Sequence, residues 1–174
     1  VGSEMCIRDR EMTANILPSA SAEKHYPIAF NLIPQIDVFC DNLYTKEEMK
    51  MVNETKKIME DYEMRITATT IRVPVYRSHS ESVNIELEKE VDLGAMREAL
   101  AKFPGVTVQD DPSKQEYPMP LYTSEKDDVY VGRLRRDESC EKSYNMWVVG
   151  DQIRKGAALN TLQIAETMIK NGWI

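Results

Sequence analysis

The spacing of hydrophobic and polar residues along the chain predicts three helices. The first extends over 45–61, where apolar and charged residues fall on opposite faces, and it opens on the capping box TKEE. The second covers 92–103, from an aspartate cap to the stop signal Pro104-Gly105. The third covers about 154–170. The apolar positions of the first two helices are Met51, Val52, Thr55, Ile58 and Met59, and Met96, Ala99, Leu100 and Phe103.

Runs with strand character separate these helices. Strands are predicted at 65–75, 83–87, 106–108, 129–135 and 144–150. The run FNLIPQIDVF at 30–39 has a central proline, which is typical of an extended edge or a bulged strand. Polar residues at 109–128 predict a loop. The order β-α-β-β-α-β-β-β-α predicts the α+β fold class with a mixed, mostly antiparallel sheet.

Length and charge narrow the possible classes of protein. A chain of 174 residues and 20.0 kDa can form one ordinary domain with a hydrophobic core. No apolar run approaches the length of a membrane span, so we expect no membrane partner. The net charge of -7 and the pI near 5.0 disfavour a nucleic-acid partner, because phosphate contacts require a basic surface. These properties fit a soluble cytoplasmic protein.

The three cysteines, Cys6, Cys40 and Cys140, are widely spaced and odd in number. With no CxxC pair, they exclude a disulfide framework and disfavour a zinc site. Cys40 follows a hydrophobic run, which is typical of a small buried apolar residue rather than a nucleophile. Residues 1–10 (VGSEMCIRDR) resemble a translated sequencing adapter, so we expect them to be non-native and the domain to comprise 11–174.

The segment 70–82 (TIRVPVYRSHSES) contains Arg72 and His79, the most suggestive pair of residues in the chain. Arginine grips a carboxylate or phosphate through two parallel hydrogen bonds, and histidine is the side chain whose unperturbed pKa lies near neutral. The pair therefore resembles an anion clamp next to an acid/base. The alternatives are a solvated sheet face for Arg72, in a strand that ends at Pro74, and a solvated polar loop for His79.

Glu47 and Lys50 lie three residues apart in the first predicted helix and therefore share a face. They form either a surface ion pair or a site that presents two opposite charges at fixed spacing. We assign the neighbouring Glu48 to the helix cap. His25 follows no functional pattern and receives no role. The sequence has no GxGxxG turn, so it offers no dinucleotide-phosphate cradle of its own.

Four blocks of the chain occur in the order and near the spacing of one enzyme family. They are FNLIPQIDVF, TKEEMK, TIRVPVYRSHSES and WVVGDQIRKGAALNTLQIAE. Together they resemble the C-terminal half of aspartate-β-semialdehyde dehydrogenases, over about residues 14–172. The resemblance implies a fold like the C-terminal domain of glyceraldehyde-3-phosphate dehydrogenase, with helices packed on one face of the sheet. It also implies a homodimer or a homotetramer.

The resemblance implies a reaction and assigns roles to five residues. The family reduces β-aspartyl phosphate to aspartate semialdehyde with NADPH, through a cysteine acyl-enzyme, in the biosynthesis of lysine, threonine, methionine and isoleucine. Arg72 is then expected to bind the substrate α-carboxylate, Glu47 its ammonium group and Lys50 the phosphate. His79 is expected to act in acid/base catalysis. Asn160 matches a position near the nicotinamide end of the NADP cofactor.

The family's glycine-rich turn, its nucleophilic cysteine and a nearby glutamine belong to an N-terminal nucleotide-binding domain. None of the three is found in this chain, so we expect 11–174 to be a partial catalytic and dimerisation domain that is inactive by itself. One alternative is the related N-acetyl-glutamyl-phosphate reductase, whose blocked substrate amino group leaves Glu47 without a purpose. The other alternative is a non-catalytic dimerisation module, in which Arg72 and His79 are simply solvated.

Overall fold

The computed structural model describes residues 15–18 and 22–174. It divides the chain into two compact units, Val1–Tyr76 and Arg77–Ile174. The adapter-like residues 1–10, with Cys6, lie outside the described residues.

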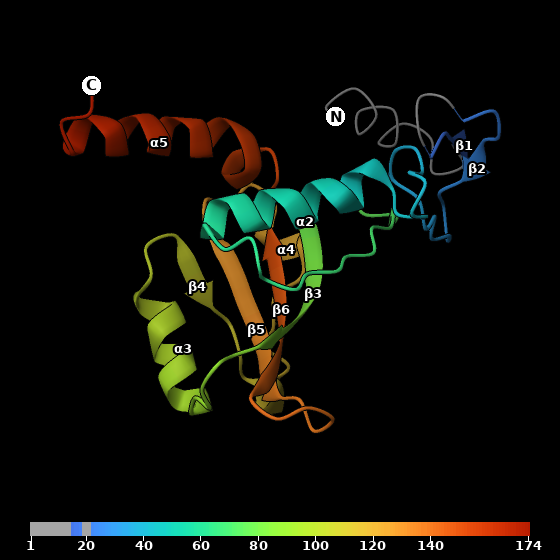
Figure 1. Cartoon of the computed structure of the whole chain (residues 1–174). Helices are drawn as coiled ribbons and strands as arrows, with labels where there is room; N and C mark the ends of the chain where they lie inside the picture. Colours follow the sequence, from blue (N-terminus) through green and yellow to red (C-terminus); the bar gives the residue numbers. More distant parts are fainter. Residues whose placement is uncertain (1–14, 19–21) are drawn as a thin grey trace. The chain divides into compact units, whose positions relative to one another are not determined.

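The main element of the first unit is the helix α2 (Lys46–Met59), which forms at the predicted place (Figure 1). Its capping box is confirmed, because the Glu48 amide donates to the Thr45 hydroxyl (3.2 Å) and the Thr45 amide donates to the Glu48 carboxylate (2.7 Å). The helix ends where Glu60 adopts a left-handed conformation, with φ at 54°. Two short strands, β1 (Asn15–Ile16) and β2 (Tyr26–Pro27), form an antiparallel pair in the same unit.

The buried residue of α2 is a glutamate rather than a member of the apolar stripe. Glu48 is only 7% exposed, whereas Met51, Ile58 and Met59 are all exposed, Ile58 by 77%. Hydrogen bonds at the N-terminus, rather than burial of the stripe, therefore fix this helix within the part of the chain that the structure describes.

The strand predicted at 65–75 is wrong. The described chain there forms no strand, and its one ladder-type contact is an isolated antiparallel bridge between Arg72 and Ile33. Pro74 and Pro34 each lack an amide donor one or two residues from that bridge, so the pairing stops there. The strand predicted at 30–39 is reduced to bridges for the same reason.

We expect Glu48→Gln to destabilise the chain by about 1–2 kcal/mol, because the Thr45 and Thr70 amides bond to different carboxylate oxygens and glutamine keeps only one acceptor oxygen. Burial raises the pKa of Glu48, but the amides of Thr45 and Thr70 lower it more, so the net pKa lies below the ordinary value. The stabilisation is thus present above the pKa of the unfolded chain and is lost as pH falls through the folded one.

Urea unfolding followed by circular dichroism between about pH 6 and pH 3 measures this effect. The stability of Glu48→Gln should depend less on pH than that of the parent. Glu54→Gln, at an exposed position of the same helix, is the matched control. Equal pH profiles for the parent and Glu48→Gln would contradict the role of the charge.

The second unit is built on a four-stranded sheet in the order β3-β6-β5-β4 (Figure 1). The strands are β3 (His79–Glu86), β4 (Val106–Val108), β5 (Val129–Arg136) and β6 (Ser143–Gly150). β6 pairs antiparallel with β3 and β5, and β4 pairs parallel with β5. The predicted mixed, mostly antiparallel sheet is confirmed.

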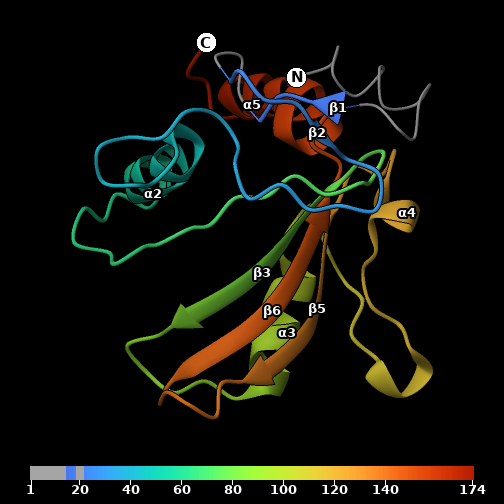
Figure 2. The ribbon, with the colours of Figure 1, turned by 90° about the vertical axis from the view of Figure 1, so that its right-hand side faces the viewer.

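Helix α3 (Leu93–Lys102) covers one face of this sheet and contacts β4 and β5 (Figure 2). Its predicted cap is confirmed, since Asp92 accepts from the Ala95 amide at 3.0 Å. The core between helix and sheet comprises Met96, Val131, Leu134 and Tyr144, with Ile85, Leu100, Val108, Met146 and Val148 packed around it. The Tyr144 hydroxyl reaches out of this core to bond Val91 on both its amide and its carbonyl, each at 2.7 Å.

The predicted loop at 109–128 contains two short helical turns, η1 (Pro112–Lys114) and α4 (Pro120–Thr123). The predicted last helix is confirmed in extent, but it begins with a π-helical segment, η2 (Arg154–Ala158), that continues into α5 (Leu159–Lys170). Several apolar side chains of α5 are exposed, among them Leu162 at 63%. No helix in the described ranges has the length and apolar character needed to span a bilayer.

Gly132→Ala should destabilise the chain by about 3 kcal/mol or more, because a Cβ at this position in β5 would lie 2.2 Å from the Gln109 carbonyl oxygen. The Gln109 backbone cannot move away without breaking the edge of the sheet formed by β4 and β5. Gly156→Ala is the control, since its Cβ would meet nothing closer than 3.7 Å. Urea midpoints measure both variants, and equal midpoints would contradict the close approach.

Candidate functional site

The first turn of α2 holds two of the predicted site residues side by side. The Lys50 ammonium lies 3.1 Å from one carboxylate oxygen of Glu47 and 3.3 Å from the other. Both side chains remain partly exposed, at 54% and 35%, so each charge is accessible to a solute. The shared face predicted for this pair is confirmed, and so is the assignment of Glu48 to the helix cap.

Glu48 also ties the segment of Arg72 to the same helix turn. Its second carboxylate oxygen accepts the Thr70 amide at 2.8 Å, 22 residues along the chain. Two residues later, Arg72 exchanges both backbone hydrogen bonds with Ile33, at 2.9 and 3.1 Å. Arg72 is half-buried, and its Nε is buried. Glu47, Lys50 and Arg72 thus belong to one unit, in which the Glu48 carboxylate connects the helix to the segment that contains Arg72.

His79 and Asn160 belong to the other unit. The loop predicted for His79 is wrong: this residue opens β3, four residues before the predicted strand, and pairs with Gly150 of β6. The missed residues 79–82 (HSES) are all polar, so they supply no apolar signal on either face of the strand. His79 is exposed at this strand end, and Asn160 is half-buried in the first turn of α5.

The sequence reasoning missed a polar cluster next to His79. Asp151 is fully buried and pairs with Arg77, whose guanidinium also donates to Glu125. Burial raises the pKa of Asp151, but three backbone amides and the Arg77 charge lower it more, so the net pKa is below the usual range. The available signal was an aspartate between a strand and a helix in VVGDQIRK, which is typical of a cap.

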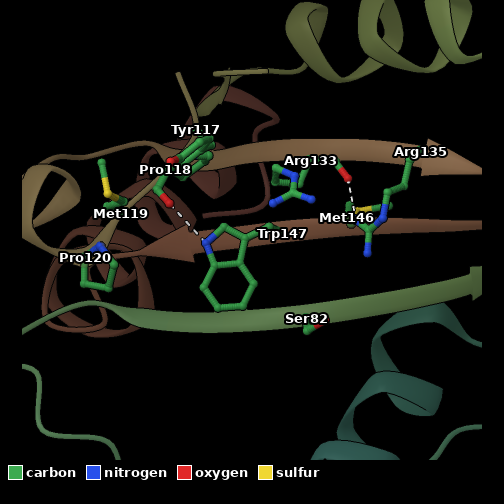
Figure 3. Close-up of a pocket in the computed structure, with 9 residues that line it drawn as sticks. All are labelled: Ser82, Tyr117, Pro118, Met119, Pro120, Arg133, Arg135, Met146 and Trp147. Carbon is green, nitrogen blue, oxygen red and sulfur yellow. Dashed lines mark hydrogen bonds between the residues drawn. The ribbon is translucent and has the colours of Figure 1, made fainter. Parts of the chain in front are cut away.

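A cavity of about 300 Å³ lies against strands β3, β5 and β6 and the segment 117–120 (Figure 3). Trp147 donates from its indole nitrogen to the Pro118 carbonyl at 3.0 Å, and Arg133 and Arg135 extend along β5 beside it. None of the predicted site residues lines this cavity. Cys40 is half-buried and Cys140 is exposed. Within the described ranges no group of acidic, histidine or cysteine side chains is arranged to hold a metal ion.

The chain is similar to known proteins over most of its length. Residues 3–155 match the family described as semialdehyde dehydrogenase, dimerisation domain. The chain belongs to this family. Among curated semialdehyde dehydrogenases, the aspartate-semialdehyde dehydrogenase of Aquifex aeolicus is 50% identical over 158 residues, which are 91% of this chain and 46% of that protein. The Bacillus subtilis enzyme of the same name is 47% identical over 169 residues, 97% of this chain and 49% of that protein.

Solved semialdehyde dehydrogenases share the fold. The crystal structure of aspartate semialdehyde dehydrogenase II from Vibrio cholerae aligns with a TM-score of 0.79 and 43% identity, over 83% of this chain and 43% of that one. The Candida albicans enzyme, solved with NADP, aligns with a TM-score of 0.68 at 24% identity, which supports the fold alone. The chain spans about half the length of the curated relatives that it matches.

Proposed function

We propose that this chain forms the substrate-binding and acid/base part of an NADPH-dependent aspartate-semialdehyde dehydrogenase. This enzyme reduces β-aspartyl phosphate to aspartate semialdehyde for the biosynthesis of lysine, threonine, methionine and isoleucine. The observation that carries the proposal is 50% identity to the Aquifex aeolicus enzyme across 91% of the chain. The structure of the Vibrio cholerae aspartate semialdehyde dehydrogenase II in complex with ASA supports a small-molecule substrate of this class.

Three residues of the first unit complement the charges of the substrate. Glu47 receives the ammonium group and Lys50 the phosphate, and their 3.1 Å pair supplies both charges on one helix turn. Arg72 receives the α-carboxylate, for which a guanidinium offers two parallel donors. These contacts act through positioning, because they hold the reacting carbonyl in one orientation.

His79 supplies the proton transfer in this proposal, since it is exposed at the end of a strand where a substrate can reach the imidazole. NADPH, when bound, supplies the hydride. The described residues fit this cofactor at one point, because the half-buried carboxamide of Asn160 can exchange hydrogen bonds with the nicotinamide carboxamide. The sequence has no glycine-rich phosphate cradle, so we assign only the nicotinamide end to this chain.

A chimera tests the proposal. This chain replaces the matching half of the Bacillus subtilis relative, and NADP reduction is followed with aspartate semialdehyde and phosphate. We expect turnover comparable to that of the parent enzyme, reassembled at the same junction as a control. A chimera with the parent's circular dichroism and mass but no turnover would contradict the proposal.

The same assay separates the two alternatives. Preference for N-acetyl-glutamate semialdehyde would favour the related reductase, which has no ammonium group for Glu47 to receive. Unchanged turnover after substitution of Arg72 and His79 would favour a non-catalytic dimerisation module.

We further propose a homodimer, in line with the dimerisation domain that the family description names, and a cytoplasmic location. A homotetramer is the second possibility. Static light scattering on the chain distinguishes these assemblies, because a dimer has twice the 20.0 kDa mass of one chain.

A further inference from the structure

We propose that the Arg77–Asp151 ion pair is a positioning device that fixes His79 and, through the same carboxylate, the helix that carries Asn160. The inference rests on the proposed function for the roles of these two residues. The pair itself touches neither the substrate nor the cofactor in this proposal.

Asp151 joins three separate segments of the second unit. Its carboxylate accepts the Glu125 amide at 2.7 Å, and its other oxygen accepts the amides of Ile153 and Arg154 at 2.9 and 3.2 Å. The last two amides open η2, so Asp151 caps the helical run that continues into α5 and Asn160. The Arg77 guanidinium completes the set at 2.8 Å. With the side chain fully buried, each of these donors offsets the cost of removing a charge from water.

Ser78 transmits the constraint to His79. Its amide donates to the Gln152 side chain at 2.9 Å, and its hydroxyl lies 3.1 Å from the Thr123 hydroxyl. Ser78 is buried and has a φ of 74°, a left-handed conformation that a serine keeps only where its surroundings impose it. The next residue is His79.

The sheet register places the same constraint on both strands. His79 pairs with Gly150, so the residues that leave the sheet at this end are Ser78 and Arg77 on one side and Asp151 and Gln152 on the other. The two side-chain contacts, Arg77 to Asp151 and Ser78 to Gln152, continue the pairing beyond the last backbone rung. The backbone of His79 is therefore held from both sides, although its imidazole is exposed.

The chain offers a matched control for the loss of a buried ion pair. Arg97 of α3 donates to Asp110 at 2.8 Å, and the Asp110 side chain is 1% exposed. The Arg97 guanidinium bonds to Asp110 and to the Leu134 carbonyl, both away from the start of β3 and from η2. Asp110→Asn therefore removes a comparable charge without disturbing the His79 strand end.

The first measurement is kinetic. In the chimera, Asp151→Asn and Arg77→Gln should lower kcat at least about tenfold with KM changed less than about twofold, because the substrate-binding residues belong to the other unit. Arg77→Lys should restore part of kcat, and Asp110→Asn should leave it within about twofold. If Asp110→Asn lowers kcat as much as Asp151→Asn does, the proposal is overturned, because the loss of any buried ion pair would then explain the effect.

The second measurement uses the full chain and needs no activity. The chain has two histidines, so the imidazole carbon–proton NMR signals are those of His79 and His25, assigned with His79→Gln. Asp151→Asn and Arg77→Gln should shift or broaden the His79 signal. Asp110→Asn should leave the His79 signal unchanged, and the His25 signal should stay the same in all three variants. An unchanged His79 signal in both variants would overturn the positioning role. If Asp151→Asn fails to fold, the comparison of Arg77→Gln with Arg77→Lys decides.

The two measurements also separate this inference from the proposed function. If His79→Gln leaves turnover of the chimera unchanged, the catalytic role of His79 is wrong. The NMR comparison still decides whether Arg77 and Asp151 position the imidazole.

Discussion

Arg72→Ala is expected to lower kcat/KM for aspartate semialdehyde by about 10²- to 10⁴-fold in the chimera. Two charge-assisted hydrogen bonds to a carboxylate contribute about 1.5–3 kcal/mol each, and each 1.36 kcal/mol corresponds to a factor of ten. The backbone of Arg72 is fixed by its two bonds to Ile33, so the segment that carries the guanidinium is ordered before substrate arrives. Steady-state kinetics with NADP and phosphate in excess measure the effect.

Two further variants make the Arg72 result specific. Arg72→Lys keeps the charge but loses the planar fork, so we expect it to recover only part of the loss. Arg65→Ala removes an exposed arginine seven residues earlier in the same extended segment and should leave kcat/KM nearly unchanged. If Arg72→Ala and Arg65→Ala give equal rates with the dimer intact, Arg72 does not bind the substrate.

The elements that the sequence predicts well are those stabilised by neighbours in the sequence. The caps of α2 and α3 are bonds across three residues, from Thr45 to Glu48 and from Asp92 to Ala95. Such bonds depend on spacing that one sequence displays directly. The strands β5 and β6 were similarly predictable, because their apolar residues face the core and give the sequence a clear strand pattern.

The elements that sequence reasoning missed depend on distant partners. The run 65–75 has strand composition, but a strand needs a second strand, and prolines on both sides limit it to the Arg72–Ile33 bridge. The amide of Thr70 bonds to the Glu48 carboxylate instead of to a ladder. The composition of a segment indicates which secondary structure it can form. It does not indicate which acceptor its backbone amides will bond to.

The cluster beside His79 illustrates the same limit at larger separation. Arg77 and Asp151 lie 74 positions apart, and their pairing follows from the β3–β6 register, which the sequence does not display. Only the cap of η2 by Asp151 is local. The roles of the candidate residues were therefore assigned by resemblance to a family, whereas the groups that hold His79 in place emerged from the structure.

The proposed roles divide between the two units. In the proposal, Glu47, Lys50 and Arg72 of the first unit bind the substrate charges, and His79 and Asn160 of the second unit serve proton transfer and the cofactor. Substitutions in the two units should accordingly affect kinetics differently. Losses of recognition should appear in both KM and kcat, and losses of proton transfer mainly in kcat.

His79→Gln is expected to reduce kcat of the chimera by about 10²- to 10⁴-fold, the usual contribution of a positioned general acid/base. Glutamine keeps a polar side chain at the exposed start of β3 but cannot transfer the proton at neutral pH. Because the substrate charges are bound by residues of the other unit, KM should change little. His25→Gln, at the second histidine of the chain, should leave kcat unchanged. A small loss for His79→Gln, no larger than that for His25→Gln, would mean that another group transfers the proton.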